Sequence, residues 1–127
     1  MSHAIEIAQY ADLPVVRASG ELDILAAPDL RAALTGCPPG ADPHLIVDLG
    51  GVTFLDSSVL GVLVGALRRA RDRGGDLWLI AGQPSVLTVL RVTNLDRVMR
   101  VRRSLASVVE EVSGQGAAVP DRGASRE

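Results

Sequence analysis

Short apolar runs alternate with segments of helical periodicity along this chain, and this alternation restricts the fold more than any other feature. Strands are expected at residues 4–10, 15–19, 44–50, 76–82 and 96–101, and helices at 26–35, 58–73, 84–94 and 104–112. A helix that connects two strands of one sheet makes those strands parallel and screens the sheet from water. The pattern therefore predicts an α/β fold with a small mixed, mostly parallel sheet of about five strands, flanked by about four helices.

The first two strands follow one another without a helix between them, so we expect them to pair as neighbours. Residues 4–10 alternate apolar and polar side chains, which is typical of a half-buried edge strand. Three residues mark helix ends. Gly74 and Asn94 are expected to end helices, and Ser104 is expected to be the N-cap of the last one.

The chain of 127 residues has about the length of one ordinary domain. We expect this domain at residues 1–112. From Ser113 onward the sequence has no periodicity and little apolar content, so residues 113–127 are predicted to form a disordered C-terminal tail.

Composition argues against several classes of partner. The formal net charge of −2 gives no overall attraction to nucleic acid or to an anionic membrane. The arginines near 68–73 and 97–103 lack the interleaved aromatic rings of a nucleic-acid surface. Cys37 is the one cysteine, so neither an internal disulfide nor a cysteine-based metal site is expected. Because no secretory signal or membrane-length apolar stretch is visible, we expect a cytoplasmic protein that contacts neither nucleic acid nor membrane directly.

Two polar clusters are expected at the same edge of the sheet. Asp56, Ser57 and Ser58 stand between a strand and a helix, and the sequence GELD at 20–23 directly follows the second strand. Sites of parallel α/β sheets lie at the carboxyl ends of the strands, where the loops enter the helices. The two clusters are therefore expected to converge there.

The serine pair has two interpretations that the residues alone leave open. Serine and aspartate are common N-caps, because their side-chain oxygens accept hydrogen bonds from the first amides of a helix. Alternatively, an exposed hydroxyl at this turn is the substrate of a second enzyme. A phosphate would add about −1.5 to −2 charges beside Glu21, Asp23 and Asp56 and repel a partner fitted to a neutral hydroxyl, while the helix N-terminus tolerates it.

Catalysis by the chain itself is not expected. A serine nucleophile needs a base within hydrogen-bond reach, but His3 lies near the terminus and His44 begins the strand whose far end leads to the serines. The chain also lacks the G-x-S-x-G elbow and the phosphate-binding G-x-x-x-x-G-K-[ST] loop. The spacing of Asp23, Asp48 and Asp56 matches no metal-ligand loop, and we expect no metal and no other cofactor.

The helix at 58–73 has three faces with different side chains. They are a core face of Leu60, Leu63, Val64 and Leu67, a strip of small residues at Ser58, Gly61 and Gly65, and a third apolar face of Val59, Val62 and Ala66. The glycine strip beside small aliphatic side chains is interpreted either as a partner surface or as part of a fully buried helix.

These residues resemble the STAS domain family, and within it the bacterial anti-sigma factor antagonists. The resemblance covers about residues 4–112 and is carried by GELD at 20–23, APDLRAAL at 27–34, LIVDLGGVTFLDSS at 45–58 and LGVLVGALRRARDRGGDLWL at 60–79. It implies a protein that binds an anti-sigma factor and thereby frees a sigma factor for transcription. The implied anti-sigma factor is also a serine kinase, of the histidine-kinase-like ATPase type, that inactivates its antagonist by phosphorylation. A metal-dependent serine phosphatase reverses the modification.

The resemblance assigns Ser57, the first hydroxyl after the aspartate, as the phosphate acceptor. Ser58 is then expected to cap the helix and line the contact. Together with the helix face described above, the residues expected at the partner surface are Glu21, Asp23, Asp56, Ser57, Ser58, Val59, Gly61, Val62 and Gly65. The protein is expected to be a monomer or a weak dimer.

Val59 departs from the family pattern, which usually has glycine directly after the hydroxyl pair. We expect its β-branched side chain to add bulk beside the acceptor and to alter phosphorylation. This departure favours a second hypothesis, in which the chain is a STAS scaffold of a stress-signalling assembly or an accessory subunit of a lipid transporter, without a phosphate switch.

Overall fold

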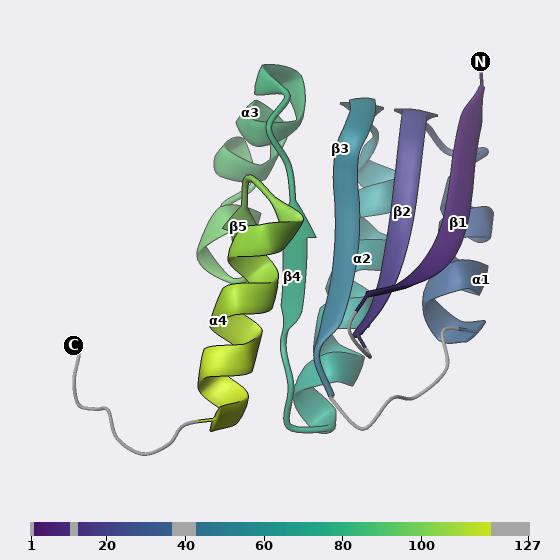
Figure 1. The fold of residues 1–127 in the computed structure, drawn as a ribbon. Helices are drawn as coiled ribbons and strands as arrows, with labels where there is room; N and C mark the ends of the chain where they lie inside the picture. Colours follow the sequence, from purple (N-terminus) through teal and green to yellow (C-terminus); the bar gives the residue numbers. More distant parts are fainter. Residues whose placement is uncertain (1, 11–12, 37–42, 118–127) are drawn as a thin grey trace.

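The computed structural model describes residues 2–10, 13–36 and 43–117. Its strands form one sheet in the order β1-β2-β3-β4-β5 (Figure 1). They are β1 (His3–Tyr10), β2 (Leu13–Leu22), β3 (Leu45–Leu55), β4 (Leu77–Ile80) and β5 (Arg100–Arg102). β1 runs antiparallel to β2, and the other neighbouring pairs are parallel. The predicted mixed, mostly parallel sheet is confirmed, as is the pairing of its first two strands.

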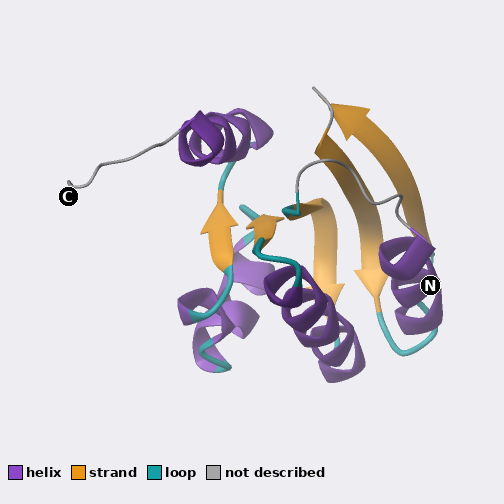
Figure 2. Ribbon diagram, turned by 90° about the horizontal axis from the view of Figure 1, so that it is seen from below, coloured by secondary structure: helices purple, strands orange, loops and turns teal. Residues whose placement is uncertain are grey.

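Helices cover both faces of the sheet (Figure 2). They are α1 (Ala27–Gly36), α2 (Ser57–Asp72), α3 (Pro84–Val92) and α4 (Leu105–Ala117). The larger core lies between the sheet and α1, α2 and α3, and a smaller core lies beneath α4 around Trp78, Val108 and Val112. The central strands are apolar over long runs because both of their faces are covered there.

Three predicted helix ends are confirmed. Gly74 follows α2 with a φ of 86°, and Asn94 follows α3 with a φ of 61°, the left-handed conformation that both residue types tolerate. At the start of α4, the amide of Ser107 donates to the hydroxyl oxygen of Ser104 at 3.1 Å, as expected for an N-cap.

The ends of three strands differ from the prediction. β3 was expected to end at Gly50 but continues through Gly51 to Leu55. β2 does not stop before Gly20 but continues to Leu22, because Gly20 adopts a φ of 87° and a register shift beside it keeps the chain paired with β3. Three residues of GELD therefore lie inside the strand, and Asp23 follows it. β5 begins at Arg100 instead of residue 96, because the chain first forms a short 3-10 helix, η1 (Leu95–Arg97).

The C-terminal helix is longer than predicted. α4 extends to Ala117, so residues 113–117 are helical and do not belong to a disordered tail. Once a helix is nucleated, each further residue adds a hydrogen bond, and α4 continues past the buried side chain of Val112. The rest of the predicted tail, residues 118–127, and the loop with Cys37 lie outside the described residues.

Candidate functional site

The turn at residues 56–58 joins the end of β3 to the start of α2. Asp56 is the N-cap of α2, and its Oδ1 accepts hydrogen bonds from the Ser58 amide at 2.7 Å and from the Ser58 hydroxyl at 2.9 Å. The bond from the amide is the main cause that holds the pKa of the Asp56 carboxyl below its usual range. The prediction that Ser58 caps the helix is wrong, because Asp56 accepts from the helix amide and Ser58 donates to Asp56.

The two serine hydroxyls differ in exposure and in hydrogen bonding. Ser58 is half-buried and bonded to Asp56, whereas Ser57 is exposed. The Ser57 hydroxyl lies 3.5 Å from the same Asp56 oxygen, at the long limit of a hydrogen bond. Ser57 therefore presents a hydroxyl that a second protein reaches without breaking a strong bond.

The GELD segment and the serine turn meet at the carboxyl ends of β2 and β3, as the sequence predicted. The backbone amide of Asp56 donates to the carbonyl of Leu22 at 3.0 Å. Within the strands, Leu22 is the register partner of Leu55, and Glu21 is the register partner of Phe54. The carboxylates of Glu21 and Asp56 are thus carried to one edge of the sheet by two different strands.

Three exposed apolar side chains lie at the same end of the sheet, and the sequence interpretation missed them. Ile24 is 66% exposed and Leu25 is 71% exposed in the loop after Asp23, and Phe54 is 48% exposed near the end of β3. The Asp23 side chain shapes this loop by accepting from the Leu25 amide at 3.0 Å. We call Ile24, Leu25 and Phe54 the apolar rim. The sequence signal that could have revealed it is the apolar pair Ile24 and Leu25 directly after the polar residues of GELD, in a loop.

The buried face of α2 differs from the predicted one. Val59 and Val62, assigned to a third face open to a partner, are buried in the larger core, whereas Leu60 and Val64 are only partly buried. The buried residues of α2 continue with helical spacing to Ala70, whereas the predicted core face would have continued to Arg71. Val59 and Val62 therefore belong to the core, and their assignment to the partner surface is wrong.

The glycine strip of α2 lies at the surface. Gly61 is exposed and Gly65 is half-exposed. A Cβ atom added at Gly61 would meet no atom within 4 Å, and one at Gly65 would lie 3.5 Å from the flexible guanidinium of Arg69. Packing within the chain therefore requires neither glycine, and the space above them is open to a partner.

Val59 does not crowd the acceptor. Its side chain is fully buried in the core, and its backbone lies within α2. The expectation that this valine adds bulk beside Ser57 is wrong, because position 59 faces the sheet while Ser57 faces solvent. The argument from Val59 for a scaffold without a phosphate switch therefore loses its basis.

Neither histidine lies at the serine turn. The Nε2 atom of His3, at the start of β1, is 2.8 Å from the carboxylate of Asp29. His44 accepts through Nδ1 from the amide of Asp76 and from the indole nitrogen of Trp78, each at 3.1 Å. Within the described ranges, no group of three or more His, Cys, Asp or Glu side chains is placed to hold a metal ion.

Among the helices of the described residues, none combines the length and the apolar character that a membrane crossing requires.

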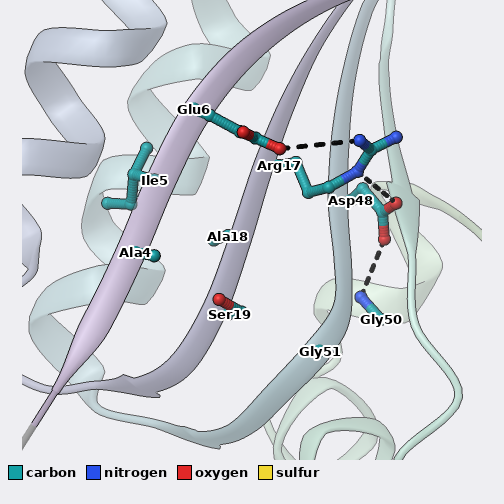
Figure 3. A pocket seen from close by; sticks show the side chains of 9 residues that line it. All are labelled: Ala4, Ile5, Glu6, Arg17, Ala18, Ser19, Asp48, Gly50 and Gly51. Atoms are coloured by element: carbon teal, nitrogen blue, oxygen red, sulfur yellow. Dashed lines mark hydrogen bonds and ion pairs between the residues drawn. The ribbon is translucent and has the colours of Figure 1, made fainter.

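A hollow of about 410 Å³ lies on the sheet face of β1, β2 and β3 (Figure 3). Gly50 and Gly51 widen it because they carry no side chains. Arg17 lies between Glu6, at 3.6 Å, and Asp48, at 3.3 Å, and Asp48 also accepts from the Gly50 amide. The charges of the hollow are paired with one another, and no residue of the serine turn lines it.

This small α/β domain presents an exposed serine at a strand-to-helix turn, surrounded by carboxylates, the apolar rim and an open glycine strip. Such an arrangement is suited to contact with a protein partner. Residues 4–108 match the STAS domain family, and the chain belongs to this family. A relative with a known role is the anti-sigma-B factor antagonist of Staphylococcus aureus. It is 28% identical over 86 residues, which are 68% of this chain and 80% of that protein.

Solved structures share the fold over most of the chain. An anti-sigma factor antagonist from Mycobacterium paratuberculosis has a TM-score of 0.78 at 26% identity, covering 89% of this chain and 96% of that one. The anti-sigma factor antagonist SpoIIAA in its unphosphorylated form has a TM-score of 0.71 at 25% identity, covering 91% and 100%. The phosphorylated form of SpoIIAA from Bacillus, at 23% identity and a TM-score of 0.64 over 86% and 99%, supports the fold alone.

Proposed function

We propose that this STAS domain is an anti-sigma factor antagonist, which binds an anti-sigma factor and thereby releases a sigma factor. The exposed hydroxyl of Ser57, beside a Ser58 hydroxyl that Asp56 engages, is the observation that carries the proposal. The relatives support it, because the Staphylococcus aureus protein and the solved neighbours are anti-sigma factor antagonists. Such a protein acts by binding and needs no catalytic group, metal or cofactor of its own. We place it in the cytoplasm with its partners.

Phosphorylation of Ser57 is the proposed switch, with the anti-sigma factor as the serine kinase and a serine phosphatase as the enzyme that resets it. SpoIIAA is known in both unphosphorylated and phosphorylated forms. A phosphate on Ser57 would add about −1.5 to −2 charges next to the carboxylate of Asp56. Because Asp56 already accepts from the Ser58 amide in the first turn of α2, the phosphate would project outward and leave the helix cap in place. The modification would then weaken binding without unfolding the domain.

The proposed partner surface combines three kinds of side chain around Ser57. Carboxylates supply charge, the apolar rim supplies area that is costly to leave in water, and the glycines allow close approach of a partner backbone. Its residues are Glu21, Asp23, Ile24, Leu25, Phe54, Asp56, Ser57, Ser58, Gly61 and Gly65.

The test is phosphorylation of the full chain by its cognate anti-sigma factor kinase with ATP. Mass spectrometry is expected to find the phosphate on Ser57, and Ser57→Ala should abolish the modification. Ser58→Ala is the matched control, because it removes the neighbouring hydroxyl and should leave Ser57 as a substrate. Undiminished modification of Ser57→Ala would overturn the assignment.

A further inference from the structure

β1 is an outer strand of the sheet, and its far edge has no neighbouring strand among the described residues. On its inner side, all eight residues are in register with β2. Just before β1, the carbonyl of Ser2 accepts from the amide of Glu21 at 3.2 Å. Alternate residues of an antiparallel pair bond to the neighbour, so the even-numbered residues of β1 bond to β2. The backbone groups of Ile5, Ile7 and Gln9 therefore point to the open edge.

The open edge of β1 lacks the devices that keep edge strands from pairing. β1 contains no proline, lysine or arginine, and its register with β2 shows no bulge. Ile7 is 43% exposed and Tyr10 is 50% exposed. The one acidic residue, Glu6, lies 3.6 Å from Arg17 of β2. A strand with free backbone groups and exposed apolar side chains is a template for another strand.

We propose that a second copy of this chain pairs with β1 in antiparallel orientation, with the two-fold axis at Ile7. The two five-stranded sheets then form one continuous sheet. A two-fold axis perpendicular to the sheet keeps the corresponding faces of the two copies on the same side. Residues that lie opposite each other must then point to the same face, so the axis passes through a residue and not between two residues. The outward backbone groups of Ile5, Ile7 and Gln9 then bond to those of Gln9, Ile7 and Ile5 of the second copy.

Side-chain charge disfavours an axis one residue away, at Glu6. An axis at Glu6 would place two Glu6 carboxylates directly opposite each other, at the closer spacing of a non-hydrogen-bonded pair, where like charges are destabilising. An axis at Ile7 instead places Glu6 opposite Ala8, pairs Ile7 with its own symmetry mate, and brings Tyr10 opposite Ala4. The strand is thus complementary to itself, which favours a second copy over an unrelated strand.

The helix beside this edge leaves room for the pairing. α1 lies against the N-terminal end of β1, where His3 bonds to Asp29 at 2.8 Å (Figure 1). A two-fold axis at Ile7 places the α1 helix of the second copy at the opposite end of the interface. The two helices are therefore kept apart along the strand direction.

Analytical ultracentrifugation of the full chain, from about 1 μM to about 1 mM, tests the proposal. The mass is expected to rise with concentration from 13.3 kDa toward twice that value. Ile7→Lys places two like charges at the axis and should weaken dimerisation at least about tenfold. Ala106→Lys, on the exposed side of α4, is the matched control and should leave dimerisation unchanged. Circular dichroism checks that both variants remain folded.

A mixture of Ile7→Lys and Ile7→Glu tests the register. Each variant alone should dimerise more weakly than the unmodified chain, and the mixture should form a heterodimer more readily than either variant pairs with itself, because position 7 faces position 7 across the axis. A wild-type chain that stays at 13.3 kDa throughout overturns the proposal. A dimer that Ile7→Lys does not weaken, or a mixture that does not associate, overturns this interface. These results do not depend on whether Ser57 is phosphorylated.

Discussion

The backbone amide of Asp56 donates a 3.0 Å hydrogen bond to the carbonyl of Leu22, joining two segments that are far apart in the sequence. Leu22 ends β2 and Asp56 follows β3, so the bond closes the edge at which both strands end. The side chain of Asp56 caps α2 at the same time. Ser57, in the first turn of α2, is therefore fixed to the sheet, and a phosphate on it would stand at a defined place in any contact.

Replacing Ser57 by aspartate is expected to weaken binding of the anti-sigma factor by at least about 1.4 kcal/mol, a tenfold loss. The added carboxylate would stand beside Asp56 and mimic part of the phosphate charge. Titration calorimetry measures the affinity. Ser57→Ala should bind within a factor of about three of the unmodified protein.

Ser113→Asp is the control for this charge change, because it adds the same charge to an exposed position of α4 on the other face of the sheet. Its affinity should equal that of the unmodified chain. Equal affinities for Ser57→Asp and Ser113→Asp would contradict an electrostatic switch at Ser57.

Two substitutions at Gly61 are expected to affect stability and partner binding separately. Because a Cβ atom there meets nothing within 4 Å, Gly61→Ala is expected to stabilise the domain by about 0.5–1 kcal/mol through helix propensity. Gly61→Trp should also fold, but its side chain would fill the space open to the partner and reduce affinity at least about tenfold. Urea unfolding and calorimetry measure the two effects. Ala106→Trp on α4 is the control, and an equal loss of affinity for both tryptophan variants would argue against a contact at Gly61.

The sequence predicted the element order because strand and helix periodicities were separated by glycine and proline. The convergence of Asp23 and Ser57 followed from topology, since parallel strands end at one edge. The length of β2 was not predictable in this way. Gly20 was interpreted as a strand end, but its positive φ supports a bulge inside the strand.

The orientation of α2 was not predictable from the helix alone. All three of its faces carry apolar or small residues, so the choice of the buried face depends on the sheet beneath it. Val59 and Val62 were therefore placed on the wrong side. The cap was also ambiguous, because Asp56 and Ser58 are both good N-cap residues, and only the geometry shows that Asp56 accepts the amide bond.

His44→Ala is expected to destabilise the domain by about 1–3 kcal/mol, because it leaves the indole N–H of the fully buried Trp78 without its acceptor. Urea unfolding followed by the fluorescence of Trp78, the one tryptophan, measures the change. His44→Asn supplies a side-chain acceptor and should recover part of the loss. His3→Ala removes an exposed contact with Asp29 and should cost less than about 1 kcal/mol. Equal effects of His44→Ala and His3→Ala would contradict the role of the indole bond.

The pair of Arg102 and Glu111 is expected to make part of the stability depend on pH. Arg102 donates to both carboxylate oxygens of Glu111, and this bonding is the main cause that lowers the pKa of Glu111 from its ordinary value. The pair holds α4 to β5, and the Arg102 guanidinium lies over the ring of Trp78, 5.3 Å from the ring centroid.

A carboxyl whose pKa is lower in the folded state stabilises the fold at pH values above its unfolded pKa, and this contribution is lost as the pH falls through the folded pKa. The difference in unfolding free energy between the unmodified chain and Glu111→Gln should therefore be constant above about pH 5.5 and shrink toward zero as the pH falls below about 4. Because both side chains are partly exposed, we expect the difference to stay below about 1 kcal/mol. Urea titrations at a series of pH values measure it.

Asp76, whose pKa is also lowered, is present in both proteins and cancels in the comparison. A difference that is independent of pH would show that Glu111 acts through packing and not through its charge.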